Sequence, residues 1–68
     1  MSRLKEIRLK LGLSQQELAD NLGEKRHRIN DMESGKSKIQ VDFAELIEEK
    51  FNIDGWWLLT GKVLRIII

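Results

Sequence analysis

The stretch from Leu11 to Lys36, LGLSQQELADNLGEKRHRINDMESGK, decides the fold of this chain. Ser14 and Glu17 have the spacing of a capping box, in which the serine hydroxyl accepts from a backbone N–H and the glutamate reaches back. Gly23 can adopt the left-handed conformation in which many helices end. The stretch therefore predicts two short helices joined by a tight turn at Gly23.

Apolar residues at helical spacing continue on both sides of this stretch. Those at positions 4, 7 and 11 predict an earlier helix that Ser2 caps. A later helix is predicted from about Gln40 to Phe51. Its inward-facing residues are expected to be Val41, Ala44, Ile47 and Phe51.

One more short helix is predicted near the C-terminal end. Asp54 is placed to cap it and Gly61 to end it. The last six residues, VLRIII over 63–68, are rich in β-branched side chains and predict a short strand or an extended arm. The expected organisation is one domain over 1–61, followed by an apolar arm over 62–68.

The composition fits one small domain of 68 residues. There is no cysteine, which excludes a disulfide scaffold, a thiol nucleophile and a Cys-based metal site. No apolar run approaches the roughly 18 residues that a membrane-spanning helix needs, and the N-terminus has no signal-peptide core. We therefore expect a soluble, cytoplasmic protein with no membrane partner.

Charge is distributed unevenly along the chain. Residues 1–40 carry nine Lys or Arg against six Asp or Glu, whereas residues 41–68 carry three against five. The net charge of +1 therefore divides into +3 and −2. Because the positive excess lies in the half that contains the two-helix stretch, it indicates an anionic partner for that half.

The two-helix stretch resembles the Cro/repressor-type (XRE-like) helix-turn-helix family, to which phage repressors belong. The matching residues are GLSQQELA over 12–19, then Leu22-Gly23, Ile29, Met32, Glu33 and Gly35-Lys36, and WLLTG over 57–61 is similar to a segment common in phage-repressor relatives. The resemblance covers roughly residues 3–61. It implies an all-α, five-helix, lambda-repressor-like DNA-binding domain whose third helix enters the major groove.

Base contacts are expected from the first part of the third helix. Arg26 and His27 match family positions that point into the groove, and an arginine can bind guanine O6 and N7 together. Asp31 matches another base-contacting position, and its carboxylate could accept from cytosine N4. Asp31 could instead pair with Arg28 or Lys38 and take no part in recognition, so both interpretations stay open.

Contacts with the DNA backbone are expected from residues around that helix. In the family, a glutamine at the position of Gln15 binds phosphate and braces the start of the third helix, and a helix N-terminus attracts phosphate. Backbone contacts add affinity without sequence preference. The residues expected to make them are Gln15, Arg28, Asn30, Ser34, Lys36 and Lys38.

The same resemblance implies a structural ion pair. The family pairs an arginine of the first helix with a glutamate near the end of the third, and Arg8 and Glu33 match these positions. We expect this pair to hold the third helix in place rather than to contact DNA. Removing one partner would leave an unpaired charge.

Catalysis, a cofactor and a bound metal are not indicated by the sequence. The acidic residues over 42–49 have helical spacings that place them opposite the apolar face, which is typical of a solvated surface. His27 has no second His or Cys with which to share a metal. We expect a non-enzymatic protein with no cofactor, no metal and no small-molecule substrate.

Apolar residues in excess of the predicted core favour self-association. Phe43 and Leu46 are placed outside the inward stripe of their helix, and Trp56 lies beside the family tryptophan, Trp57. Contiguous exposed apolar area usually marks an interface, so we expect a homodimer. The alternative is that the tail folds back over its own core. The expected dimer residues are Phe43, Leu46, Trp56, Ile66, Ile67 and Ile68.

Two functional hypotheses follow from these features. The first is a sequence-specific, nucleoid-associated regulator of transcription that binds double-stranded DNA, a repressor of phage or mobile-element type. The second is a protein-interaction module on the same fold, antitoxin-like or an adaptor, with weak or no specific DNA recognition. Glu24, the absence of a Ser or Thr cap at Lys25 and the acidic Asp31 favour the second.

Overall fold

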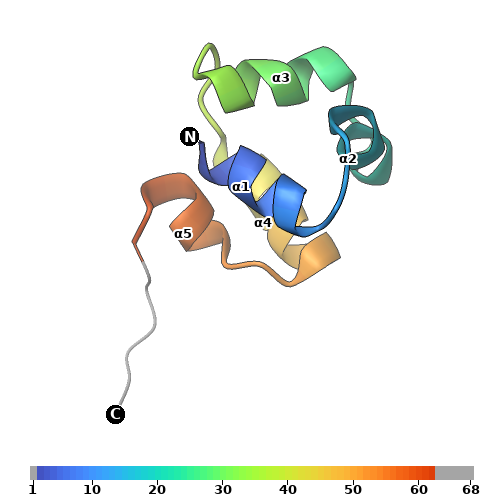
Figure 1. Cartoon of the computed structure of the whole chain (residues 1–68). Coiled ribbons are helices and arrows are strands. Elements are labelled where there is room, and N and C mark those ends of the chain that lie inside the picture. Colours follow the sequence, from blue (N-terminus) through green and yellow to red (C-terminus); the bar gives the residue numbers. More distant parts are fainter. Residues whose placement is uncertain (1, 63–68) are drawn as a thin grey trace. The chain divides into compact units, whose positions relative to one another are not determined.

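The computed structural model describes residues 2–62 and contains five α-helices in that part of the chain (Figure 1). No strand occurs among these residues, so the predicted five-helix, all-α fold is confirmed. The arm predicted over 62–68 lies, from residue 63 onward, outside the described residues. The helices are α1 (Arg3–Lys10), α2 (Gln15–Leu22), α3 (Arg26–Ser34), α4 (Val41–Phe51) and α5 (Gly55–Thr60).

The chain divides into two compact units between Lys38 and Ile39, and the first unit contains α1, α2 and α3. In this unit α2 and α3 pack against each other, and α1 packs against α3. Leu11 was expected on the buried face of the first helix, but it is 39% exposed because α1 ends at Lys10. The buried apolar residues of the unit are Leu4, Ile7, Leu18, Ala19, Leu22, Ile29 and Met32.

The turn into α2 and the turn out of it have the predicted form. Ser14 Oγ accepts from the Glu17 N–H at 3.0 Å, and Glu17 Oε1 accepts from the Ser14 N–H at 2.8 Å, which completes the capping box. Gly23 ends α2 with a φ of 69°, a conformation that costs glycine little. Because these signals are local, they start and stop α2 at the residues that the sequence indicates.

The second unit contains α4 and α5, which pack against each other. Phe43 is 2% exposed, whereas Val41 is 63% exposed, so the predicted inward stripe of this helix is wrong at both positions. The buried residues of α4 are Phe43, Ala44 and Ile47, which follow an i, i+1, i+4 spacing. Val41 is the first residue of α4, where the preceding turn that would cover its side chain is missing.

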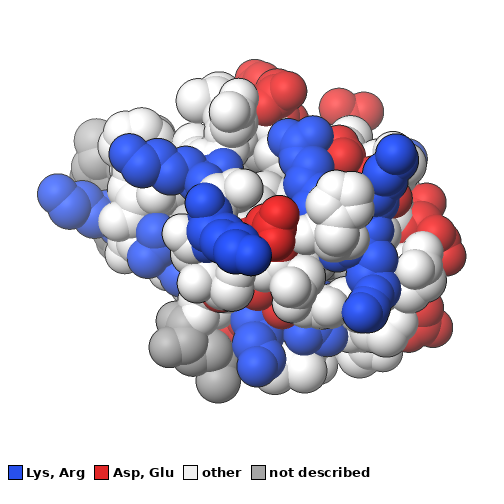
Figure 2. Space-filling model, turned by 90° about the horizontal axis from the view of Figure 1, so that it is seen from above, with Lys and Arg blue, Asp and Glu red and all other residues white. Residues whose placement is uncertain are grey.

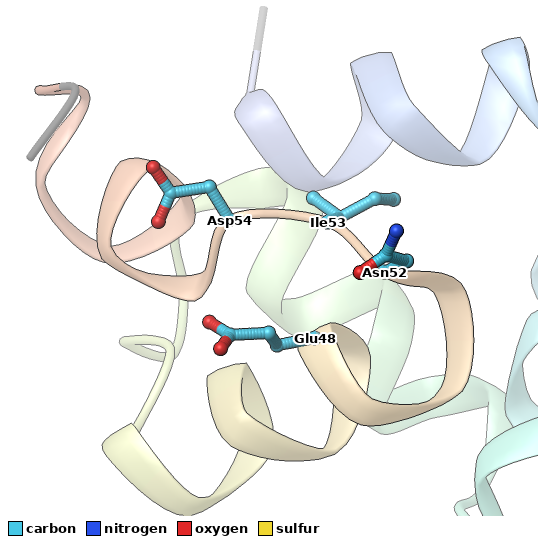
Figure 3. A pocket seen from close by; sticks show the side chains of 4 residues that line it. All are labelled: Glu48, Asn52, Ile53 and Asp54. Carbon is cyan, nitrogen blue, oxygen red and sulfur yellow. The ribbon is translucent and has the colours of Figure 1, made fainter. Parts of the chain in front are cut away.

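Two carboxylates from different positions cap α5. Asp54 Oδ1 accepts from the Trp56 N–H at 2.9 Å, and Glu48 Oε1 accepts from the Gly55 N–H at 2.8 Å. A Cβ at Gly55 would lie 2.9 Å from that Glu48 oxygen and 3.0 Å from the Ala44 carbonyl oxygen, so a larger residue would force both neighbours to shift. Figure 3 shows the shallow pocket that Glu48, Asn52, Ile53 and Asp54 line at the connection of α4 to α5.

Candidate nucleic-acid interface

Helix α3 has a buried side and an exposed side. Ile29 and Met32 belong to the buried side. We define the α3 stripe as the exposed residues Arg26, His27, Asn30 and Ser34. Positions 26, 30 and 34 have the i, i+4, i+8 spacing of one side of the helix, and position 27 lies beside them at i, i+3 from position 30. Arg26 and His27, for which the sequence predicted base contacts, are both exposed at the start of α3.

Asp31 and Asn30 differ in their exposure. Asp31 is half-buried at the edge of the α3 stripe, whereas Asn30, expected to contact the DNA backbone, is exposed in the middle of it. Asn30 continues the i, i+4 spacing of Arg26 and Ser34, whereas Asp31 lies four residues after His27 and is less exposed. Asn30 is therefore a functional candidate of a kind that the sequence did not indicate.

Basic side chains surround the α3 stripe. Lys25, Lys36 and Lys38 are exposed, and Arg28 is half-buried. Viewed from the side on which α3 lies in Figure 1, many Lys and Arg side chains spread over the face of the molecule, with some acidic side chains between them and at its margin (Figure 2). This face offers the positive charge that a phosphate backbone attracts.

Lys36 is held by the turn that follows α3. The carbonyl oxygen of Asp31 accepts from the backbone N–H of Lys36 at 2.9 Å and of Ser37 at 3.2 Å. The Ser34 hydroxyl donates to the same oxygen at 3.2 Å, and Gly35, with a φ of 87°, ends the helix there. The backbone that carries Lys36 is thereby tied to the last turn of α3.

The start of α3 has no side-chain cap, as the sequence predicted. Lys25 is the N-cap residue with extended backbone, and its side chain makes no capping hydrogen bond. Unpaired N–H groups at a helix N-terminus carry partial positive charge, and here they lie beside Lys25, Arg26 and His27. These N–H groups and the neighbouring basic side chains would therefore stabilise an anion bound at the start of α3.

Arg28 forms an ion pair with Glu24. Arg28 Nη1 lies 3.1 Å from Glu24 Oε1 and donates to both carboxylate oxygens. Ion pairs of this exposed i, i+4 kind contribute little to stability. A phosphate can therefore compete with Glu24 for Arg28.

Arg8 and Glu33 form the ion pair that the resemblance implied. Arg8 Nε donates to Glu33 Oε2 at 2.6 Å, Nη2 donates to Oε1 at 3.1 Å, and Nη1 donates to the Leu13 carbonyl at 2.9 Å. The two side chains are only 10% and 5% exposed. This arrangement joins α1, the α1–α2 connection and the last turn of α3.

The electrostatics of the pair follow from its burial and its hydrogen bonds. Burial alone would raise the pKa of Glu33, but the hydrogen bonds from Arg8 and Gln15, with the charges of Arg8 and Lys5, lower it overall. The hydrogen bond to Glu33 raises the pKa of Arg8, against the opposing effect of burial. Both groups are thus held in their charged forms.

Gln15 does not brace the start of α3, contrary to expectation. Its Nε2 donates to Asn30 Oδ1 at 3.2 Å and to Glu33 Oε1 at 3.1 Å, both farther along the helix. Asn30 and Glu33 offer the acceptor oxygens to which the Nε2 group of Gln15 donates.

The described residues contain neither a metal-like cluster nor a membrane-length helix. No group of three or more His, Asp or Glu side chains is arranged to hold a metal ion within residues 2–62. No helix in the same range is long and apolar enough to cross a bilayer.

Comparison with known proteins identifies the family. The family model described as helix-turn-helix matches residues 4–57. The chain belongs to this helix-turn-helix family. The resemblance found in the sequence is therefore confirmed, and the fold is one that DNA-binding regulators use.

A curated protein and the solved structures complete the comparison. The chain is 30% identical over 66 residues to the propionyl-CoA carboxylase regulator of Cereibacter sphaeroides. The matched region is 97% of this chain but only 14% of that protein, so the chain spans about a seventh of the length of its relative. No solved structure matches the chain significantly.

Proposed function

We propose that this protein is a sequence-specific transcriptional regulator that binds double-stranded DNA by inserting α3 into the major groove. The observation that carries the proposal is the α3 stripe, an exposed row of Arg26, His27, Asn30 and Ser34 flanked by exposed lysines. In the helix-turn-helix docking mode, the N-terminal residues of the recognition helix contact base edges. Here those residues are Arg26 and His27.

The proposed contacts divide into bases and backbone. Arg26 and His27 contact bases, whereas Lys36 and Lys38 contact phosphates. Arg28 also contacts a phosphate, which replaces Glu24 as its partner. Ser34, at the far end of the stripe, also reaches the backbone. These cationic contacts supply affinity that does not depend on sequence.

Gln15 contacts phosphate in a different way from the one expected. The hydrogens of its Nε2 are directed at Asn30 and Glu33, so the side chain has no donor left for an anion. Its backbone N–H lies at the start of α2, where the helix dipole and unpaired donors favour phosphate. We therefore assign the phosphate contact of Gln15 to its backbone.

The proposal includes a homodimer and a repressor of phage or mobile-element type in the cytoplasm. Trp56 is 44% exposed and Leu46 is half-buried, which leaves apolar surface on the second unit. Phe43 is buried and is withdrawn from the proposed dimer surface. The remaining predicted dimer residues, Ile66, Ile67 and Ile68, lie outside the described residues. A dimer would bind half-sites about one helical turn apart.

The relative named as a regulator supports a regulatory role. Its printed name concerns propionyl-CoA carboxylase, and the shared region is 14% of its length. We therefore take from it the regulatory class and not its target.

The competing hypothesis is a protein-interaction module on the same fold. The half-buried, acidic Asp31 and the uncapped Lys25 still favour it. Glu24 no longer does, because its carboxylate is bound by Arg28 and offers less charge to a protein partner.

A salt titration against random duplex DNA separates the two hypotheses. A DNA-binding regulator loses affinity steeply as salt rises, because phosphate contacts release counterions. Absence of binding at low salt would favour the interaction module. Arg26→Ala should relax selectivity, whereas Lys36→Ala should weaken all sequences alike and reduce the salt slope by about one.

A further inference from the structure

We propose that Asn30 is a specificity-determining residue that contacts a guanine through its Nδ2 donors, because Glu33 and Gln15 fix the orientation of its amide. The inference rests on the proposed function. It assigns a base contact to a residue for which the sequence indicated only a backbone contact.

The orientation originates at the Glu33 carboxylate. Arg8 donates to both of its oxygens, at 2.6 and 3.1 Å, and holds it in the ionised form. An ionised carboxylate has no hydrogen and can only accept. The group 3.1 Å from Glu33 Oε1 in Gln15 must therefore be the Nε2 donor and not the amide oxygen.

Gln15 in turn fixes the orientation of the Asn30 amide. Its Nε2 carries two hydrogens, of which one points at Glu33 Oε1 and the other at Asn30 Oδ1, 3.2 Å away. With Nε2 in that place, the atom of Asn30 that faces it must be the acceptor Oδ1. The Asn30 Nδ2 group then points away from Gln15, on the exposed side of α3.

The α3 stripe consequently presents donors at its centre. Within residues 2–62 no hydrogen bond from Asn30 Nδ2 is found, so its two N–H groups are available to a ligand. In the major groove, guanine presents the adjacent acceptors O6 and N7, whereas cytosine presents the N4 donor. The pairing of asparagine with adenine uses both ends of the amide, and here the oxygen end is bound to Gln15.

The test is Asn30→Asp, with binding sites selected from a random duplex pool by the wild-type chain and by the variant. The aspartate keeps an oxygen for Gln15 but replaces the outward Nδ2 with a second acceptor. The wild type should enrich guanine at one position of each half-site. The variant should lose that preference at least about fivefold and gain cytosine there, with other positions unchanged.

Ser34→Asp is the matched control, since it adds the same charge to the same stripe. It should weaken all sequences without changing the preference at the Asn30 position. A second variant, Gln15→Met, removes the donor that orients the asparagine. It should admit adenine at the same position, because Asn30 can then use both ends of its amide.

The results separate failure of this inference from failure of the proposed function. If the wild type enriches no sequence, both are overturned. If it enriches a site but Asn30→Asp leaves every preference unchanged, or weakens all sequences as Ser34→Asp does, only the role of Asn30 is overturned. Circular dichroism on each variant establishes whether it is folded. If Asn30→Asp does not fold, the Gln15→Met result alone tests the role of Asn30: adenine admitted at that position supports it, and an unchanged preference overturns it.

Discussion

Arg8 and Glu33 are 25 residues apart in sequence, yet they share two hydrogen bonds in a nearly buried ion pair. The guanidinium also binds the Leu13 carbonyl, and the carboxylate also binds Gln15. The pair thus fixes the end of α3 to α1 and to the start of α2. The position of α3 depends on this one polar cluster as well as on apolar packing.

Glu33→Ala should lower the free energy of unfolding by about 3 kcal/mol, because it leaves Arg8 nearly buried without its partner. Urea denaturation followed by circular dichroism measures this change. Glu24→Ala is the control, since it removes an exposed ion pair and should cost less than about 1 kcal/mol. Equal losses in the two variants would contradict a structural role for the buried pair.

Stability should fall as the solution becomes acidic, in a way that depends on Glu33. The folded state lowers the pKa of this carboxyl, so the unfolded chain takes up its proton first. The stabilisation is complete above the unfolded pKa of about 4.3 and is lost as the pH falls through the lower folded value. Urea midpoints between about pH 6 and pH 3 should drop for the wild type, and the drop should be shallower for Glu33→Gln. Parallel curves would refute this assignment.

Lys25→Ser should stabilise the fold and weaken DNA binding. The lysine occupies the N-cap of α3 with extended backbone but without a capping hydrogen bond, and a serine there contributes about 1 kcal/mol. Loss of the cation should reduce affinity for all duplexes alike. Thermal unfolding and a binding titration measure the two effects. A variant that gains stability and keeps full affinity would show that Lys25 lies away from the DNA.

Trp56→Ser should convert the proposed homodimer to a monomer, because it removes exposed apolar surface from the second unit. Light scattering coupled to gel filtration gives the molar mass. Leu9→Ser is the control, since Leu9 is also an exposed apolar side chain but belongs to α1. A wild-type chain that stays monomeric above tens of micromolar would disprove the dimer.

The helices could be predicted from the sequence because their signals are local. The Ser14 capping box and the turn at Gly23 involve residues within four positions of each other. The inward face of α4 was mispredicted because two overlapping apolar rows, one through Val41 and one through Phe43, both have helical spacing. Packing against α5 and the start of the helix decide between them, and neither is visible in the periodicity.

The sequence predicted the exposure of the basic side chains of the site but not the contact between its two amide side chains. Arg26, His27 and the lysines are exposed as expected, because such polar side chains are rarely buried without a partner. The contact of Gln15 with Asn30 joins residues 15 positions apart and depends on how α2 meets α3. No local pattern determines such a contact, and the family expectation placed Gln15 one turn too early.

The turn after α3 has a consequence for how this protein can change. It is held by the main-chain carbonyl of Asp31, a group that every amino acid possesses. Side chains at position 31 can therefore be exchanged while Lys36 keeps its anchorage. Under the proposed function, substitutions along α3 would change the base contacts, while the phosphate contact proposed for Lys36 would be kept.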